Sequence, residues 1–353
     1  MKYLCTMNRE ELILAFSRLG KLMESLSHTD EWPGYTLGVT EEEWVTLKTV
    51  MNRQFFYNGW FTKESVAQSL AALGKQLTEA HLASWLHDYT FVQSPKRVAI
   101  IMAGNIPLVG FHDFLCVLLS GNTAVCKLSS DDKTLLPALA VPLIAFLPAL
   151  KDRIEFTVGP VKNIDAVIAT GSDNSSLYFE QYFGKYPHIF RKNRTSVAVL
   201  TGEETQEELK GLGNDIFDHY GLGCRNVSQL LIPKEYSLSI FFEGIFSFSE
   251  VVLNKKYGNN YDYHKAIFLM NQDQLFDNNF VLLREASELF SPLAMVHFQR
   301  YENQKEVDHF LTSNTESIQV VVGKSFTPFG SAQCPMLSDY ADGVDTMEFL
   351  NQL

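Results

Sequence analysis

The feature that most constrains the fold is an alternation of short apolar runs with helical stretches between residues 97 and 200. The runs are rich in β-branched residues and read RVAIIMA (97–103), TAVCKLS (123–129), IEFTVG (154–159), DAVIAT (165–170) and SVAVL (196–200). Short strands separated by helices are typical of βαβ units, in which helices cover both faces of a parallel sheet. We therefore predict an α/β fold whose ligand binds at the carboxyl ends of the strands.

A helical segment precedes this region, and a second α/β unit follows it. EELILAFSRLGKLMESL and ESVAQSLAALGKQLTEAHLASWL repeat apolar residues at helical spacing. Beyond residue 200 we predict a helix over 204–221, strands over 228–233, 292–298 and 317–323, and a polar, tyrosine-rich loop over 254–265. The predicted domains are 1–200 (helical N-terminal segment and cofactor domain), 201–330 (catalytic domain) and 331–353 (C-terminal tail or helix).

Charge and cysteine content narrow the function classes. A formal net charge of −12 disfavours binding to nucleic acid, because phosphate backbones are repelled. The five cysteines follow no disulfide or zinc spacing, and the N-terminus lacks the features of a signal peptide, so we expect a cytoplasmic protein. The most apolar run, residues 134–150, is short for a membrane span and contains three prolines, so it predicts a buried helix.

Cys224 is the first candidate for chemistry. It stands in a Gly-x-Gly-Cys turn between a predicted helix and a predicted strand. Arg225 is adjacent and His219 is near, and positive charge would raise the thiolate fraction that a nucleophile needs. A buried structural cysteine is the commoner role of such a residue, and the local sequence leaves both interpretations open.

Polar residues follow three of the predicted strands. The amide of Asn105 could donate to a developing oxyanion, or the residue could simply form a turn. Lys127 could contact a cofactor ribose or phosphate, or be a solvated charge. Thr170, Gly171 and Ser172 open a helix, where backbone N–H groups hold a pyrophosphate or are capped in the ordinary way.

In this order the motifs resemble those of the aldehyde dehydrogenase superfamily, and in particular the LuxC-like fatty acyl-CoA reductases of bacterial bioluminescence. AIIMAGNIP is similar to the superfamily's strand–Pro-Trp-Asn–Pro segment, and GNTAVCKLSS to its Gly-Asn-Thr…Lys-Pro-Ser-Glu segment. ATGS matches the Thr-Gly-Ser turn, and SELFSPL is similar to the Glu-Ile-Phe-Gly-Pro segment. GLGCRNVSQ falls where the nucleophilic cysteine belongs. The resemblance covers about residues 97 to 330.

The resemblance implies an aldehyde-dehydrogenase-like fold, with a Rossmann-type cofactor domain and a smaller α/β catalytic domain. It makes Cys224 the nucleophile and Asn105 part of the oxyanion hole, so we expect the two to lie side by side. The implied cofactor residues are Lys127, Ser129 and Ser130 at the adenosine ribose, Thr170, Gly171 and Ser172 at the phosphates, and Glu288 and Phe290 at the nicotinamide.

Two departures from the family pattern carry information. Ser130 replaces the carboxylate that grips both ribose hydroxyls of NAD, which predicts that NADPH is accepted or preferred. The stretch HIFRKNRTSVAV (188–199) has no carboxylate where hydrolytic relatives keep a general-base glutamate, which suits acyl exchange with a thiol such as CoA. Arg191, Lys192 and Arg194 there could contact phosphates of the carrier or cofactor, or form a solvated basic stretch.

We therefore predict NAD(P)H-dependent reduction of an acyl-CoA to the aldehyde, with CoA as leaving group and no metal. The alternatives are an aldehyde dehydrogenase, a reductase of an acyl phosphate such as glutamyl phosphate, and a non-catalytic nucleotide-binding protein. Cys334 is the rival nucleophile. Three aspartates, 339, 342 and 345, suggest either a metal site or a capped terminal helix, and the chain could form a homo-oligomer.

Overall fold

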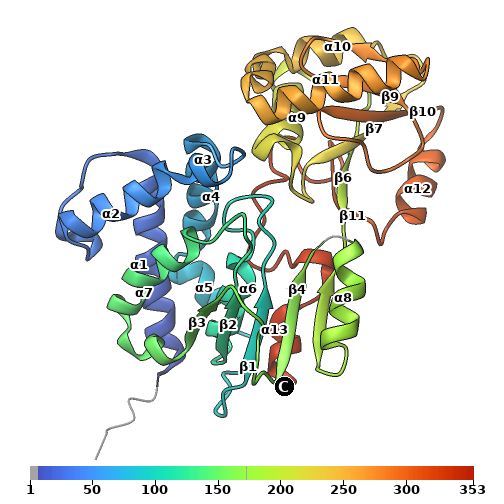
Figure 1. Cartoon of the computed structure of the whole chain (residues 1–353). Coiled ribbons are helices and arrows are strands. Elements are labelled where there is room, and N and C mark those ends of the chain that lie inside the picture. Colours follow the sequence, from blue (N-terminus) through green and yellow to red (C-terminus); the bar gives the residue numbers. More distant parts are fainter. Residues whose placement is uncertain (1–6, 172) are drawn as a thin grey trace, which may run out of the picture. The chain divides into compact units, whose positions relative to one another are not determined.

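The computed structural model describes residues 7–171 and 173–353, and its chain divides into two compact units (Figure 1). The first unit runs to Lys192 and includes Met336–Leu353, and the second is Asn193–Pro335. Each unit contains a sheet of its own. The predicted α/β class and the helical N-terminal segment are both confirmed.

The sheet of the first unit is entirely parallel, and its strands have the order β3-β2-β1-β4-β5. Its strands are β1 (Arg97–Ile101), β2 (Thr123–Lys127), β3 (Ile154–Thr157), β4 (Ala166–Thr170) and β5 (His188–Arg191). The three central strands are buried along almost their whole length, as expected for a sheet covered on both faces. This is why they read as unbroken apolar runs rather than as alternating ones.

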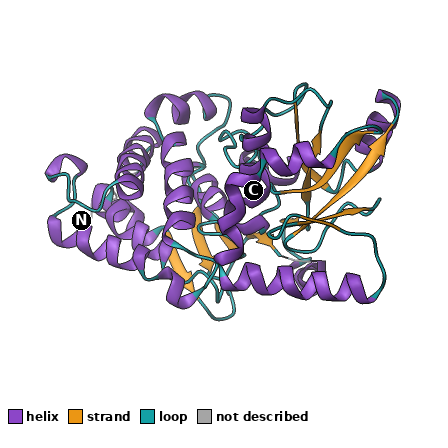
Figure 2. Ribbon diagram, turned by 90° about the horizontal axis from the view of Figure 1, so that it is seen from above, coloured by secondary structure: helices purple, strands orange, loops and turns teal. Residues whose placement is uncertain are grey.

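Helices flank this sheet, as Figure 2 shows. They are α6 (Phe111–Leu119), α7 (Leu135–Phe146), the 3₁₀ helix η2 (Pro148–Asp152), α8 (Asp173–Phe183), η5 (Ala341–Gly343) and the terminal α13 (Thr346–Asn351). The apolar run 134–150 forms α7 and η2, and α7 buries one face in the core as predicted. Within the described part of the chain, no helix has the length and hydropathy needed to span a membrane.

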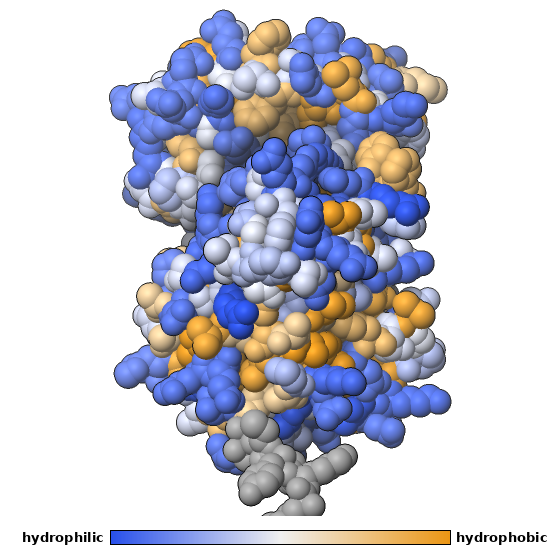
Figure 3. All heavy atoms as spheres, turned by 90° about the vertical axis from the view of Figure 1, so that its left-hand side faces the viewer, coloured by the Kyte–Doolittle hydropathy of each residue, from blue (hydrophilic) through white to orange (hydrophobic). Residues whose placement is uncertain are grey.

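The N-terminal helical segment packs on the same core. It consists of α1 (Arg9–His28), η1 (Tyr35–Leu37), α2 (Glu41–Asn52), α3 (Gln54–Tyr57), α4 (Lys63–Gln76) and α5 (Glu79–Trp85). Helices α1 and α4 touch through two glycines: a Cβ on Gly74 would stand 2.9 Å from the carbonyl oxygen of Gly20. On the face of the molecule seen in Figure 3, hydrophobic residues gather in patches among hydrophilic ones.

The sheet of the second unit has the order β11-β6-β7-β10-β9-β8, and only the β8–β9 pair is antiparallel. Its strands are β6 (Thr195–Val199), β7 (Val227–Pro233), β8 (Phe276–Asp277), β9 (Leu282–Glu285), β10 (Met295–Tyr301) and β11 (Ile318–Gly323). We expected residues 196–200 to close the first sheet, and this was wrong, because β6 pairs with β7 and β11. A short buried strand looks the same in sequence whichever sheet it joins.

The helices of the second unit are α9 (Gln206–Phe217), η3 (Asp218–Gly221), α10 (Leu238–Gly244), η4 (Phe246–Leu253), α11 (Lys255–Met270) and α12 (Gln304–Ser313). The predicted loop over 254–265 was wrong, because these residues begin α11. The side chain of Asn254 caps the helix by accepting from the backbone N–H groups of Lys256 and Tyr257. Tyr257 and Tyr261, one turn apart, bury the inner face, and their polar neighbours hid this pattern.

Candidate functional site

The loop after β1 that carries Asn105 lies against the loop after β2. The backbone N–H of Met102 donates to the carbonyl oxygen of Lys127 at 3.1 Å. A Cβ on Gly104 would stand 2.5 Å from the hydroxyl oxygen of Ser129, so only glycine allows this close approach. Asn105 itself is exposed. The predicted oxyanion residue and the predicted ribose residues therefore meet at one edge of the first sheet.

Asp132 fixes the far end of the Asn105 loop, and no motif in the sequence pointed to it. Its Oδ2 accepts from the backbone N–H of Leu108 at 3.0 Å, and Leu108 has a left-handed backbone (φ 61°). The carboxyl group is buried, and its Oδ1 has no partner among the described residues. Burial raises the pKa of Asp132, although the hydrogen bond from Leu108 opposes this shift.

The predicted adenosine-ribose residues have different environments. Lys127 and Ser129 are half-buried, and the hydroxyl of Ser129 accepts from the backbone N–H of Asp131 at 3.2 Å. Ser130, which we aligned with a carboxylate of the aldehyde dehydrogenase pattern, is exposed. A ligand at this edge would meet one cation and two hydroxyl groups.

The turn after β4 leads directly into α8. Thr170 and Gly171 are half-buried, whereas Ser172 lies outside the described residues. A Cβ on Gly171 would stand 2.8 Å from the Cβ of Ser175 and 3.0 Å from the ring of Phe179, so the turn packs tightly on the helix. The N-terminal end of an eleven-residue helix presents N–H groups suited to phosphate. Together with Lys127, this edge fits a dinucleotide.

Arg191 has a structural position, which corrects our interpretation of the basic stretch at that residue. Its guanidinium pairs with Asp113 at 2.6 Å, and both side chains are buried. It also donates to the carbonyl oxygen of Ala341 at 2.7 Å and to Thr346 Oγ1 at 2.9 Å. Because these contacts hold the C-terminal segment, Arg191 is neither a phosphate contact nor a solvated charge, whereas Lys192 is exposed.

In the second unit, Cys224 is exposed in a turn whose backbone is tightly held. The hydroxyl of Ser196 donates to the carbonyl oxygen of Cys224 at 3.0 Å. Asn226 Oδ1 accepts from the backbone N–H of Gly223 at 2.8 Å. Asn226 Nδ2 also donates to the carbonyl oxygens that end the preceding helix: Asp215 (3.1 Å), Ile216 (3.3 Å) and Asp218 (2.8 Å). The turn is thus fixed from both sides.

His219 does not supply the positive charge that we expected near Cys224. It is buried and lies in a left-handed turn, with Tyr220 and Gly221 also at positive φ. Desolvation lowers the pKa of His219 to about 4, so the ring is neutral at neutral pH. The cationic side chain next to Cys224 in sequence is Arg225, whose Nη1 donates to the carbonyl oxygen of Ala332 at 3.4 Å.

The other cysteines in the described part of the chain differ in exposure. Cys116 and Cys126 are buried, and desolvation raises the pKa of each thiol, so neither is suited to act as a nucleophile. Cys334 is exposed, like Cys224. It follows a segment that Asp215 holds by accepting from the backbone N–H groups of Gly330 (2.7 Å) and Ala332 (2.9 Å). Burial raises the pKa of Asp215 to about 6.

The loop after β9 carries Glu288 and Phe290, and both side chains are exposed. Between them Leu289 is buried, and its carbonyl oxygen accepts from the hydroxyl of Ser228 at 2.9 Å. Because Ser228 lies near the start of β7, shortly after Cys224, the turn that carries Cys224 and the Glu288 loop share one end of that strand.

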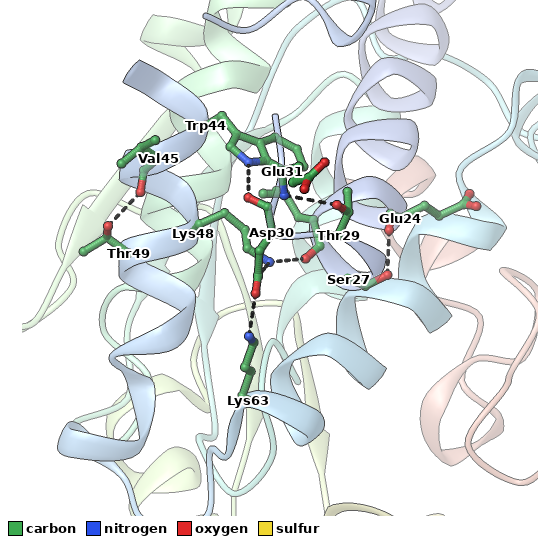
Figure 4. A network of polar contacts seen from close by, with 11 residues as sticks. Glu24, Ser27, Thr29, Asp30, Glu31, Trp44, Val45, Lys48, Thr49 and Lys63 are labelled. Carbon is green, nitrogen blue, oxygen red and sulfur yellow. Dashed lines mark hydrogen bonds and ion pairs between the residues drawn. The ribbon is translucent and has the colours of Figure 1, made fainter. Parts of the chain in front are cut away.

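A separate hollow of about 130 Å³ lies in the helical segment, beside the end of α1 and helices α2 and α4. At its rim Asp30 pairs with Lys48 at 2.6 Å and with Lys63 at 2.9 Å (Figure 4). Hydrogen bonds from Lys48 and then Lys63 lower the pKa of Asp30 to about 2. Asp30 neutralises one of the two lysine charges. We therefore interpret this network as an ionic contact that joins the segment after α1 to helices α2 and α4.

One of the C-terminal aspartates caps a helix. The side chain of Asp345 accepts from the backbone N–H of Glu348 and caps α13, as the second interpretation of these aspartates predicted. Among the described residues, no cluster of three or more histidine, cysteine or acidic side chains is arranged to hold a metal ion.

Comparison with known proteins gives a family and a fold. Residues 43–219, half of the chain, match the family described as acyl-CoA reductase (LuxC). The matched residues include the Asn105 loop and the residues after β2 and β4, whereas Cys224 and Glu288 lie beyond them. No curated protein matches the sequence.

Solved structures of similar fold include aldehyde dehydrogenases. A mutant indole-3-acetaldehyde dehydrogenase from P. syringae, bound to NAD⁺ and IAA, shares 12% identity over 90% of this chain and 72% of its own, with a TM-score of 0.62. Aldehyde dehydrogenase 21 from Physcomitrella patens shares 10% identity over 90% of this chain and 74% of its own, with a TM-score of 0.62. An aldehyde dehydrogenase from Bacillus cereus in complex with NAD⁺ shares 11% identity over 90% of this chain and 72% of its own, with a TM-score of 0.59.

Proposed function

Because the chain belongs to the acyl-CoA reductase (LuxC) family, we propose that it reduces an acyl-CoA to the aldehyde through an S-acyl intermediate on Cys224. The observation that carries this proposal is an exposed cysteine in a turn that Ser196 and Asn226 hold rigid. A fixed turn orients the sulfur for attack and avoids loss of conformational freedom during the reaction. The thiols suit a reducing compartment, so we assign the protein to the cytoplasm.

The first step is acyl transfer to the protein. The Cys224 thiolate attacks the thioester carbonyl, the bond from the acyl carbon to the CoA sulfur breaks, and the departing CoA thiolate takes up a proton. In this proposal the Asn105 amide and the backbone N–H of Cys224 donate to the oxyanion. A donor of this type contributes about 3–4 kcal/mol to the transition state.

The residues proposed to hold NADPH or NADH are those at the edge of the first sheet and in the Glu288 loop. Lys127, Ser129 and Ser130 take the adenosine ribose, and the turn before α8, with Thr170, Gly171 and Ser172, takes the pyrophosphate. Glu288 and Phe290 take the nicotinamide end. When bound, the cofactor supplies the hydride that brings the acyl carbon to the aldehyde level. Cys224 then leaves as the thiolate, and the aldehyde is released.

The absence of a carboxylate over residues 188–199 supports a thiol rather than water as the acyl partner. Arg191 in this stretch is engaged by Asp113 and cannot act as a base. An acyl-enzyme without a general base hydrolyses slowly, so the acyl group stays on the sulfur until reduction.

Oxidation of free aldehydes is the second candidate function, and the likeness to aldehyde dehydrogenases favours it. Rapid production of acid from aldehyde without CoA would support it over acyl-CoA reduction. A substrate panel that includes acyl phosphates tests the third chemistry available to this fold.

Intact-protein mass spectrometry after mixing with acyl-CoAs of several lengths tests the proposed function. Without any cofactor, the wild type and the Cys334→Ala control should each gain one acyl group, whereas Cys224→Ala should gain none. An acylated Cys224→Ala variant, or loss of acylation in Cys334→Ala, would overturn the assignment of the nucleophile. Ping-pong kinetics should accompany the covalent intermediate.

A further inference from the structure

The Glu288 loop (residues 286–290) has one buried side chain among exposed ones. Glu288 and Phe290 are exposed, whereas Leu289 between them is 7% exposed and packs in a core cluster. A ligand at this loop therefore meets two side chains whose positions depend on the backbone that carries them. What fixes the backbone also fixes the ligand contacts.

Polar side chains from two neighbouring strands hold that backbone by its carbonyl groups. The hydrogen bonds run from Gln229 Nε2 to Ala286 O (3.2 Å), from His297 Nδ1 to Glu288 O (2.8 Å) and from Ser228 Oγ to Leu289 O (2.9 Å). Three of the five residues in the loop are thus anchored without use of their side chains. The donors come from β7 and β10, which lie side by side in the sheet.

The geometry fixes the tautomer of His297. A carbonyl oxygen only accepts, so Nδ1 must carry the hydrogen that it shares with Glu288. The other ring nitrogen, Nε2, is buried and has no partner among the described residues. A proton there would place an unpaired charge in the interior, and burial lowers the pKa of His297 accordingly. The ring is therefore neutral and donates through Nδ1.

Gln229 repeats the pattern beside it. Gln229 and His297 are register partners on the parallel pair β7–β10, and both are almost completely buried. Gln229 Oε1, like His297 Nε2, has no partner among the described residues. Each side chain leaves an acceptor buried and unpaired, which destabilises the fold relative to an apolar residue. What each provides in return is a donor aimed at the loop.

We propose that His297 is a positioning residue which, with Gln229 and Ser228, sets the Glu288 loop for the nicotinamide end of the cofactor. This inference rests on the proposed function, because that function assigns Glu288 and Phe290 to the cofactor. Acyl transfer to Cys224 needs no cofactor and therefore does not depend on the placement of this loop. Cofactor affinity and acyl transfer should respond differently when an anchor is removed.

The test compares His297→Leu, which removes the donor, with His297→Asn, whose side-chain amide nitrogen can take the place of Nδ1. The dissociation constants of NADPH and NADH are measured by fluorescence titration, and acylation of Cys224 is measured by mass spectrometry without cofactor. His297→Leu should weaken the binding of both cofactors roughly tenfold. The acylation rate should stay within about twofold, because the loop is not needed for that step. His297→Asn should recover most of the affinity.

Gln299→Met is the matched control, because Gln299 lies two residues along β10 and also has a buried, unpaired Oε1. It donates no hydrogen bond to the Glu288 loop among the described contacts, so cofactor affinity should not change. Ser228→Ala deletes a single oxygen and serves if His297→Leu does not fold. It should weaken cofactor binding severalfold.

Unchanged cofactor affinity in folded His297→Leu or Ser228→Ala would overturn the inference, as would an equal loss of affinity in Gln299→Met. A failure of the proposed function would look different. In that case the wild type would not acylate with any thioester, while the cofactor titrations would still report on the loop.

Discussion

The Asn105 loop and the Glu288 loop are held in opposite ways. Each follows the carboxyl end of a parallel strand, β1 in the first unit and β9 in the second. The Asn105 loop offers a backbone N–H to a buried carboxylate, Asp132. The Glu288 loop offers carbonyl oxygens to neutral donors. The carboxylate of Asp132 can take up a proton and lose its charge, whereas the donors that hold the Glu288 loop are neutral and have no charge to lose.

This difference separates the two loops by their response to pH. Burial raises the pKa of Asp132, which brings its titration toward neutral pH. Burial lowers the pKa of His297, which moves its titration away from neutral pH. The loop assigned to acyl chemistry is thus held by a group whose titration lies closer to neutral pH, and the loop assigned to the cofactor by a group whose titration lies farther from it.

The largest effect should come from exchanging the two loops' outward side chains for alanine. Asn105→Ala should lower kcat by about 10²–10³, because it removes one oxyanion donor, and should leave cofactor affinity unchanged. Glu288→Ala should instead weaken cofactor binding, roughly tenfold, and leave acylation of Cys224 intact. Steady-state kinetics with cofactor titrations on both variants measure the two effects.

Asn105→Asp is the control for size, since it keeps the shape of the side chain but replaces the donor with an acceptor. It should be at least as slow as Asn105→Ala. If Asn105→Ala weakened cofactor binding and left kcat unchanged, the assignment of acyl chemistry to the Asn105 loop and of cofactor binding to the Glu288 loop would be wrong.

A smaller effect is expected at the anchor of the Asn105 loop. Asp132→Ala leaves the Leu108 N–H buried without its acceptor and should reduce the free energy of unfolding by about 1–3 kcal/mol. Asp132→Asn keeps an acceptor and should be milder. Urea unfolding at several pH values measures both.

The pH dependence has a definite sign. Because the pKa of Asp132 is higher in the folded protein, the folded state binds more protons than the unfolded state between the unfolded value of about 3.9 and the raised folded value. The free energy of unfolding contributed by this group is therefore greatest below that window and falls as pH rises through it. Asp132→Asn should lack this component. Identical pH profiles for the wild type and Asp132→Asn would contradict the assignment.

Much of the fold follows from local pattern. Strands β1, β2 and β4 were predictable because burial on both faces leaves unbroken apolar runs. The buried helix α7 was predictable because the apolar run 134–150 contains three prolines and is short for a membrane span. Partner choice was not predictable, as β6 shows, because the apolar pattern of a strand does not specify its neighbour. Helix α11 was missed because only two tyrosines face the core.

The candidate site likewise contains residues that could be predicted from the sequence and residues that could not. The residues that we propose to contact ligands stand in motifs, so Asn105, Cys224 and Glu288 could be nominated from sequence. Their anchors lie far away along the chain or carry no motif, as with Ser228, which is 61 residues from its acceptor. A signal did exist for His297, which is a histidine inside an apolar strand whose position calls for a buried partner. Arg191 gave no such signal, because a paired and a solvated arginine look alike in sequence.

The smallest effect is expected at Ser130. It tests whether the edge of the first sheet that carries the Asn105 loop also determines the preference for NADPH or NADH. The side chain is exposed, and the resemblance to aldehyde dehydrogenases aligns it with a carboxylate. Ser130→Glu would place a negative charge near the 2′-phosphate of NADPH, so the ratio of kcat/KM for NADPH to that for NADH should fall roughly tenfold. Ser130→Ala, which adds no charge, should change the ratio little. Since no residue of the Glu288 loop faces the adenosine ribose in this proposal, Glu288→Ala should leave the ratio unchanged. If Ser130→Glu left this ratio unaltered, the placement of the 2′-phosphate at this edge of the sheet would be wrong.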